Sequence, residues 1–399
     1  MKKKVWEAWR GAAMGVRTAG ASARDAAGRW LFTGLVALGG AVALALSGCA
    51  STGGAAATPP SSEAPSAGKK ENITTPPIQV KVVVVTMFEI GNDTGDTAGE
   101  FQLWHDRQKL SQRIPFAHHH DLYFNPETGV LGMVTGMGTA NSATATMELG
   151  MDPRFDLSHA YWLVAGIAGV DPQDASIGSA AWAEYLVDGD LAHEIDAREI
   201  PADWPTGYFA RGTRKPYDPK KPPNDGEVFQ LNPALTEWAY QLSKNTKLND
   251  SANLAATRGK FTGYPNAQKP PFVLKGDNLA AMTFWHGKIL NEWADKWVNY
   301  WTDGKGNFVT SAMEDTGTYQ ALTYLHPTGK VNKNRVMVLR TASNYTMPPP
   351  GMTAAEHLLR ENDGYAGLEA SVEAAYRVGS VVVDEIVGKW ATYKDHTPQ

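Results

Sequence analysis

The stretch Val80-Lys81-Val82-Val83-Val84-Val85 decides the fold class of this chain. Valine is β-branched, and an apolar run without alternation is typical of a strand that is buried on both faces of a sheet. Further short strands are predicted at residues 129–134, 160–165, 180–187 and 335–340. Helical patterns separate them at residues 141–149, 232–244, 278–293 and 354–386, the last with a break near Asp363-Gly364. This alternation predicts an α/β fold, a single three-layer domain whose mixed, mostly parallel central sheet binds ligands at the carboxyl ends of its strands.

The composition allows a large core and argues against one class of partner. Of the 399 residues, 43% are hydrophobic, and the 13 Trp, 14 Tyr and 12 Phe are more typical of a packed core than of a stacking surface. The formal net charge is −5, without blocks of Lys or Arg, which argues against nucleic acid as a partner. One large domain can contain a core of this size.

The N-terminal residues have the pattern of a targeting segment. A basic start, Met1-Lys2-Lys3-Lys4, precedes an apolar run at 30–46, which is short for a transmembrane helix of about 20 residues. The run ends in Leu46-Ser47-Gly48-Cys49, which resembles the lipobox of bacterial lipoprotein signal peptides. The resemblance implies a signal peptide at 1–48, a lipid on Cys49, and a location in the bacterial cell envelope, on the periplasmic or cell-surface side. The alternative is an uncleaved anchor helix with an incidental cysteine.

The residues after this segment divide into a tether and a domain. Residues 49–77 are rich in Ala, Gly, Ser, Thr and Pro, which is typical of a flexible tether, and 78–399 form the predicted domain. Cys49 is the only cysteine, so we expect no disulfide within the chain. We expect no other segment to cross a bilayer.

A glycine-bearing loop, Thr135-Gly136-Met137-Gly138-Thr139, follows one predicted strand and precedes a helix. Glycines allow close backbone approach, and the helix start offers free N–H groups to an anion or a hydroxyl. The dinucleotide fingerprint needs a third glycine, and position 141 is Asn, which disfavours NAD. Together with Gly91, this loop could line an anion or sugar site; the alternative is a tight strand–helix turn.

Two later stretches have the chemistry of a nucleoside site. Ser311-Ala-Met-Glu-Asp-Thr-Gly317 places Glu314 after Met313, and a carboxylate can accept hydrogen bonds from both hydroxyls of a ribose. The strand Val336-Met-Val-Leu-Arg-Thr-Ala-Ser-Asn344 ends in two polar residues, and an amide there can reach a nucleobase. The alternatives are an exposed carboxylate at a helix start for Glu314 and a turn residue for Asn344.

The order of these motifs along the chain resembles a known superfamily. Between the glycine loop and Met313-Glu314 lie the glycine-bearing stretches 164–170 and 177–181 and the segment 188–196. This order resembles the nucleoside phosphorylase and nucleosidase superfamily, and more closely the purine nucleoside permease family. The resemblance implies a nucleoside-phosphorylase-like fold, ribose binding by Met313 and Glu314, and base binding by Ser343, Asn344 and Asp277. Asp277 is equally plausible as a helix N-cap.

The resemblance also implies catalytic and sugar-binding candidates. Asn344 stands where the nucleosidases have an acid; an amide cannot donate that proton, but it can stabilise charge on the base. Glu89, just past the first strand, could position a water or the sugar, and His119 could cover the 5′ end of the sugar. The triplet His118-His119-His120 is not predicted to bind metal, because adjacent residues in an extended stretch point to opposite faces. No cofactor is expected.

Phosphate remains a possible co-substrate that the sequence disfavours. Where phosphorylases of the superfamily have an Arg and a Ser, this chain has Val164 and Ile167. Arg107, Arg113 or Arg340 could supply the charge instead. The resulting hypothesis is a protein that binds purine nucleosides for uptake or for cleavage of the N-glycosidic bond by a nucleosidase or phosphorylase activity. The alternatives are a non-catalytic binder that delivers to a transporter, and a storage or structural protein. The resemblance also implies a homo-oligomer.

Overall fold

The computed structural model describes residues 76–361 and 364–398, and its main sheet has twelve strands. The predicted signal peptide, Cys49 and nearly all of the predicted tether lie outside the described residues. The central strand β2 (Val82–Thr86) is formed by the valine run and pairs in parallel with β5 (Val130–Val134) and β7 (Tyr161–Val170). Strand β16 (Val336–Tyr345) pairs in parallel with the other edge of β7. The predicted α/β class with a mixed sheet is confirmed.

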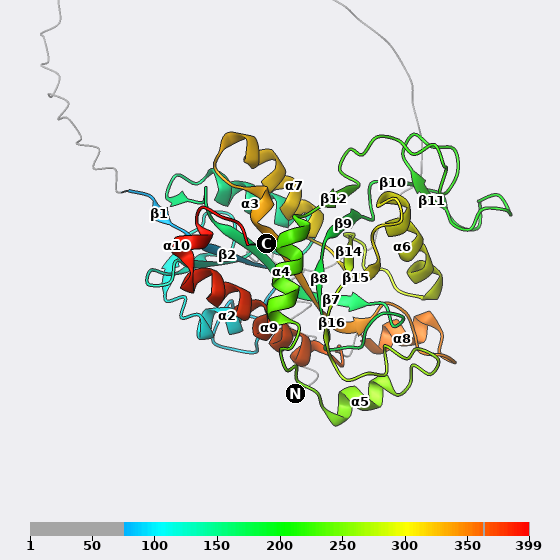
Figure 1. The fold of residues 1–399 in the computed structure, drawn as a ribbon. Coiled ribbons are helices and arrows are strands. Elements are labelled where there is room, and N and C mark those ends of the chain that lie inside the picture. Colours follow the sequence, from blue (N-terminus) through cyan, green and yellow to red (C-terminus); the bar gives the residue numbers. More distant parts are fainter. Residues whose placement is uncertain (1–75, 362–363, 399) are drawn as a thin grey trace, which may run out of the picture. The chain divides into compact units, whose positions relative to one another are not determined.

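The two faces of the sheet are covered by different helices, as Figure 1 shows. Val83 and Val85 pack in one core with α3 (Thr139–Met151) and α7 (Asp315–Leu325). Val82 and Val84 pack in a second core with α2 (Gln102–Arg107), α4 (Pro233–Ser243) and α9 (Leu368–Gly388). Successive side chains of a strand point to opposite faces, so the unbroken valine run supplies both cores. The three-layer prediction is confirmed for the described residues.

One edge of β7 is shared by two strands. β2 pairs with its first half, at residues 161–164, and β15 (Phe308–Ala312) pairs with its end in the antiparallel direction, at Gly169 and Val170. Between these two partners lies a short stretch of β7 that no strand covers on that edge. Ile167 and Gly169 are the two residues of β7 that are not fully buried. We call this stretch, residues 165–168, the forked edge.

The remaining elements surround this centre. The strands are β1 (Ile78–Gln79), β3 (Gln112–Ile114), β4 (Leu122–Asn125), β6 (Phe155–Asp156), β8 (Ala180–Ala183), β9 (Tyr185–Asp188), β10 (Ala192–Glu194), β11 (Tyr208–Ala210), β12 (Val228–Gln230), β13 (Val273–Lys275) and β14 (Asp277–Ala280). The helices are α5 (Ala252–Arg258), α6 (Lys288–Trp301), α8 (Ala354–Glu361) and α10 (Trp390–Tyr393), with 3-10 turns at His326–Thr328 and Lys333–Arg335. Among the described residues, no helix combines the length and apolar character that a membrane crossing requires.

The predicted helix at 278–293 is wrong for residues 278–287 and right from residue 288 onward. Residues Asp277–Ala280 form strand β14, which pairs in parallel with β9 and β15, and α6 begins only at Lys288, after Gly287 with a φ of 129°. Asp277 therefore starts a strand and is not a helix N-cap. The predicted break in 354–386 is confirmed, since α8 ends at Glu361 and α9 begins at Leu368. The single strand predicted at 180–187 is two strands, β8 and β9, because the chain leaves the ladder at Glu184.

Candidate functional site

The carboxyl end of β16 carries the predicted base-binding pair. The pairing of β16 with β7 shifts between Ala342 and Asn344, and Asn344 lies opposite Gly169. Such a bulge re-aims the side chains that follow it. The Ser343 hydroxyl donates to Oδ1 of Asn344 at 2.8 Å, and both residues are buried. The bulge at Ser343 thus fixes the direction of the Asn344 amide.

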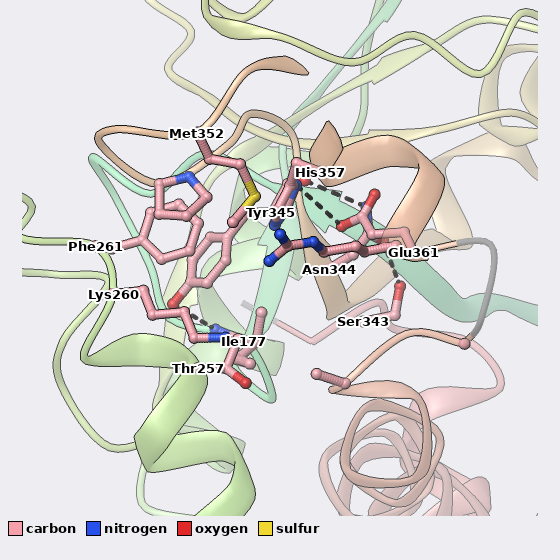
Figure 2. A pocket seen from close by; sticks show the side chains of 14 residues that line it. Ile177, Thr257, Lys260, Phe261, Ser343, Asn344, Tyr345, Met352, His357 and Glu361 are labelled. Carbon is pink, nitrogen blue, oxygen red and sulfur yellow. Dashed lines mark hydrogen bonds and ion pairs between the residues drawn. The ribbon is translucent and has the colours of Figure 1, made fainter. Parts of the chain in front are cut away.

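Ser343 and Asn344 form part of the wall of a cavity of about 140 Å³. The rest of the wall comes from α5, α8 and the loops beside them, and Figure 2 shows the side chains around the hollow. The remaining lining residues are Ile177, Thr257, Lys260, Phe261, Tyr345, Pro349, Met352, His357, Arg360, Glu361, Gly364 and Ala366. The structure therefore brings the predicted pair together with a set of polar residues that the sequence did not single out.

Three of these unpredicted residues form a cluster beside Asn344. The ring nitrogens His357 Nδ1 and His286 Nε2 are 3.0 Å apart, and Glu361 lies within 3.8 Å of both rings. Burial lowers the pKa of both histidines to about 4, and in His286 the neighbouring His357 adds to the effect. Burial raises the pKa of Glu361 to about 8, against a hydrogen bond with Asn344 that lowers it. We call these three residues the His–His–Glu cluster.

A sequence signal for part of this cluster existed. His357 and Glu361 stand four residues apart in a predicted helix, and that spacing places two side chains on one face. His286 has no such signal, since it precedes α6 in a loop far away in the sequence.

The predicted ribose-binding carboxylate is buried between a loop and a cation. Glu314 is 4% exposed, so the alternative of an exposed helix-start residue is wrong. Its Oε1 accepts a hydrogen bond from the Gly138 N–H at 3.0 Å, and its Oε2 lies 3.0 Å from Arg340 Nη2. Arg340 also pairs with Asp315 at 2.8 Å. Burial raises the pKa of Glu314, while the Arg340 charge opposes the shift.

The predicted glycine loop and the Met313-Glu314 pair come together. Gly138 precedes the first residue of α3 with a φ of 91°, and Gly136 also has a positive φ, of 83°. The Thr139 hydroxyl donates to the Met313 carbonyl at 2.9 Å, and the Thr135 hydroxyl donates to the carbonyl of Gly136. A helix N-terminus attracts an anion, and here that anion is the carboxylate of Glu314.

A second buried carboxyl group, Glu100, forms a hydrogen bond with the backbone of the forked edge of β7. Its two oxygens accept hydrogen bonds from the backbone N–H groups of Met87 and Ile167, both at 2.8 Å. Arg340 donates to the Ile167 carbonyl at 3.1 Å. Burial raises the pKa of Glu100 to about 8, and the Arg340 charge opposes this. Glu100 lies in the segment before α2, where no sequence pattern pointed to it.

Glu89 and Gly91, like Glu314 and the glycine loop, are not among the residues that line the cavity at Asn344. Glu89 accepts hydrogen bonds from the N–H groups of Gly99, Phe101 and Gln102, at the start of α2. Gly91 packs so closely against the Asp96 carboxylate that a side chain at position 91 would collide with it. The catalytic role of Glu89 stays a prediction, with its carboxylate already engaged by the backbone.

His119 and Asp277 also have partners within the protein. His119 Nε2 lies 3.2 Å from the Glu148 carboxylate on α3. Asp277 accepts hydrogen bonds from the N–H groups of Glu184, Tyr185 and Asn307, which fixes the amino ends of three strands. Neither residue lines the cavity at Asn344. Their assigned ligand contacts stay predictions.

The arginines that could have bound phosphate are engaged elsewhere. Arg107 forms a salt bridge with Glu373 and Arg113 one with Asp121. Arg340 is held by Glu314 and Asp315. Val164 is buried in the core.

Comparisons with known proteins agree with the order of motifs. A family model described as purine nucleoside permease (NUP) matches residues 79–398. A purine nucleoside permease of Candida albicans is 30% identical over 318 residues, which cover 78% of this chain and 76% of that protein. A probable purine nucleoside permease of Schizosaccharomyces pombe is 29% identical over 279 residues, 68% of this chain and 79% of that protein.

Similar solved structures share little sequence with this chain. A putative 5′-methylthioadenosine/S-adenosylhomocysteine nucleosidase from Francisella philomiragia is 15% identical, with a TM-score of 0.47, over 76% of this chain and 98% of that one. The futalosine hydrolase of Helicobacter pylori is 15% identical, with a TM-score of 0.46, over 77% of this chain and 98% of that one.

Proposed function

The chain belongs to the purine nucleoside permease family, and from that premise we propose that it binds purine nucleosides with the base against Asn344. The observation that carries this proposal is the buried Ser343-Asn344 pair in the wall of a cavity at the end of β16. An amide offers both a donor and an acceptor to the edge of a purine. Two curated relatives that carry the name purine nucleoside permease support the same ligand class.

The size of the cavity suggests that the base and the ribose of the nucleoside bind at two adjacent places. Pockets that take up a whole drug-sized ligand have volumes of roughly 300–1,000 Å³. At about 140 Å³ this cavity suits a base alone. Ser311, near the end of β15, and Asn344, in β16, both lie opposite Gly169 of β7. Met313 and Glu314 come directly after β15, so they leave the sheet in the same region as Asn344. The ribose then lies toward Glu314, whose Oε1 has a lone pair beyond the one used by Gly138, while Oε2 already accepts from Arg340 and from the Met313 N–H.

Capture for uptake is the primary role, and bond cleavage is the second candidate. Asn344 cannot act as the general acid that a leaving base needs. If the N-glycosidic bond is cleaved, water is a better candidate attacker than phosphate, because Arg107, Arg113 and Arg340 are all paired with carboxylates. Phosphate as a co-substrate remains the less favoured alternative.

The cellular setting is proposed from the N-terminal sequence. Lipidation at Cys49 would anchor the domain to a membrane on the extracytoplasmic side of a bacterial envelope, with a transporter partner for translocation. Membrane fractionation of cells, with a Cys49→Ala variant beside the native chain, tests this proposal. Release of the variant from the membrane fraction supports it, and unchanged membrane association contradicts it. A homo-oligomer stays a prediction that light scattering of the same sample checks.

The binding proposal is tested by calorimetry on the purified full-length chain. Inosine, guanosine and adenosine are titrated beside uridine, and purine nucleosides are expected to bind while uridine does not. Asn344→Ala is expected to weaken purine binding about tenfold or more, since a lost hydrogen bond of about 1.4 kcal/mol corresponds to tenfold. Asn299→Ala, on the exposed side of α6, is the matched control and should bind like the native chain.

The same samples decide between capture and cleavage. Free base is measured by chromatography after incubation with and without phosphate. Binding without base release indicates capture, release without phosphate indicates hydrolysis, and release only with phosphate would reverse the preference for water. Unchanged affinity of Asn344→Ala would contradict the placement of the base.

A further inference from the structure

The His–His–Glu cluster lies where two segments meet. His286 comes from the loop before α6, while His357 and Glu361 stand one turn apart on α8. His357 and Glu361 line the cavity beside Asn344, and His286 lies behind them with a side chain that is 0% exposed. Figure 2 shows His357 and Glu361 side by side next to Asn344. Two segments distant in sequence thus direct three ligand-type side chains to one point.

Two polar atoms of this cluster are buried without a hydrogen-bond partner among the described residues: His286 Nδ1 and Glu361 Oε2. Glu361 has a side chain that is only 10% exposed. Buried polar atoms in native proteins nearly always have a partner, because desolvation without one is costly. Two orphaned atoms that face the same point therefore indicate that a further group binds between them.

The distances within the cluster are too long for hydrogen bonds to the carboxylate. Glu361 Oε1 is 3.7 Å from His357 Nδ1, and Glu361 Oε2 is 3.8 Å from His286 Nδ1. Nitrogen–oxygen hydrogen bonds measure roughly 2.7–3.2 Å. Ligand atoms that bind one zinc ion at about 2.0–2.2 Å in a tetrahedral arrangement lie roughly 3.3–3.5 Å from each other. One potential ligand atom from each residue can be chosen so that all three lie within 4.8 Å of one another.

We propose that His286, His357 and Glu361 form a binding site for a divalent transition metal of the zinc class, with an open coordination position toward the cavity at Asn344. Two imidazoles and one carboxylate suit zinc and its neighbours, whereas calcium and magnesium prefer oxygen ligands throughout. Three protein ligands leave the fourth position of a tetrahedral ion free, and that position faces the cavity because two of the ligands line it. The metal site shares this cavity with the proposed base site but does not require nucleoside binding.

The protonation states favour this assignment. Imidazole must be neutral to bind a metal, and burial keeps the pKa of both histidines near 4.

The test is a zinc titration of the full-length chain after removal of metals with EDTA and dialysis. With zinc chloride alone and no nucleoside, one zinc ion per chain is expected by elemental analysis after gel filtration. His286→Ala and His357→Ala should each lower zinc affinity by more than about 100-fold, a loss at least as large as that for outer-shell partners. Zinc should also raise the melting temperature of the native chain but not of these variants.

Two controls separate this site from other histidines. His396→Ala changes an exposed histidine and should leave zinc binding unchanged. A variant with His118, His119 and His120 all changed to Ala should also retain zinc; a loss there, with binding kept in His357→Ala, would overturn the proposal. If the alanine variants do not fold, Glu361→Gln and anomalous diffraction of native crystals soaked in zinc decide. A zinc peak between the three residues supports the site, and no peak or a peak elsewhere contradicts it.

Discussion

Glu314 shows how one buried side chain can hold a loop and a cation together. Its carboxylate accepts from the N–H of Gly138 and pairs with Arg340, which is itself 1% exposed. Removing one member of a buried ion pair leaves the charge of its partner uncompensated. This destabilises the protein strongly, even though the intact pair contributes little net stability. The same carboxylate is the proposed partner of the ribose hydroxyls, so its structural and ligand roles must be separated by experiment.

Glu314→Ala tests both roles. Because Arg340 retains Asp315, we expect a loss of unfolding free energy of about 3 kcal/mol, at the low end for a broken buried pair, by denaturant titration. Ribonucleoside affinity should fall far more than free-base affinity in calorimetry. Glu292→Ala, whose exposed carboxylate is 3.8 Å from Lys288, is the matched control and should change stability by less than about 0.5 kcal/mol. Equal loss of nucleoside and base binding would rule out the ribose role.

At the residue scale, the sequence indicated site residues near the ends of strands, but not residues that contact one another only in the folded structure. Ser343 and Asn344 could be found because a polar pair at the end of an apolar run is a local pattern. His286 could not, since its contact with His357 depends on how the loop before α6 packs against α8. The involvement of Glu100 also depends on tertiary structure, because its hydrogen-bond partners belong to β7 and to the residue after β2.

The helix and strand boundaries show where tertiary pairing overrides local pattern. The segment after Asp277 has apolar residues at helical spacing. Residues Asn278–Ala280 nevertheless form a strand, because they pair with β9 on one edge and with β15 on the other. Helix propensity is a weak preference that such pairing readily outweighs. Where the local signal was strong, as in Asn232-Pro233 at the start of α4, element type and start agree: the Asn232 side chain accepts from the N–H groups of Ala234 and Leu235.

The start of α3 offers a test at the level of an element. Gly138 has a φ of 91°, which side chains of L-residues rarely adopt, and an added Cβ would lie 3.2 Å from Met282. Gly138→Ala should therefore lower the unfolding free energy by about 1–2 kcal/mol, measured by denaturant titration. Gly388→Ala, at the end of α9 with open space around it, is the control and should be neutral or slightly stabilising. A neutral Gly138→Ala would show that the loop relaxes without strain.

At the scale of the whole molecule, the sequence predicted the three layers of the fold but not the forked edge of β7. Alternating strands and helices predict a three-layer α/β domain whatever the detailed order of strands. The arrival of β15 at β7 in the antiparallel direction depends on pairings between residues more than a hundred positions apart. Sequence periodicity carries no information on such pairings.

The stability of the molecule should fall as pH rises from about 6.5 to 8. Glu100 and Glu361 have pKa values raised to about 8 by burial, whereas in the unfolded chain they titrate near 4.5. In this window the folded protein binds protons that the unfolded chain has already lost, so unfolding free energy decreases with pH, by up to about 2 kcal/mol per group. The lowered pKa values of His286 and His357 act below pH 6.5 and oppose the trend only there.

Thermal unfolding followed by circular dichroism, with EDTA present, measures this trend. Glu361→Gln should show a smaller decrease of melting temperature between pH 6.5 and 8 than the native chain. A melting temperature that rises over this interval would contradict the assignment. Asp196→Asn is a suitable control, because its pKa of about 2 lies outside the window and its side chain is exposed.

The forked edge of β7 has one further consequence. Within the strand ladders, backbone N–H groups donate to peptide carbonyls, which do not change charge at any pH of interest. At Met87 and Ile167 the acceptor is instead the carboxyl group of Glu100, which can gain or lose a proton near neutral pH. The forked edge of β7 is thus a place where the strength of main-chain hydrogen bonding varies with pH.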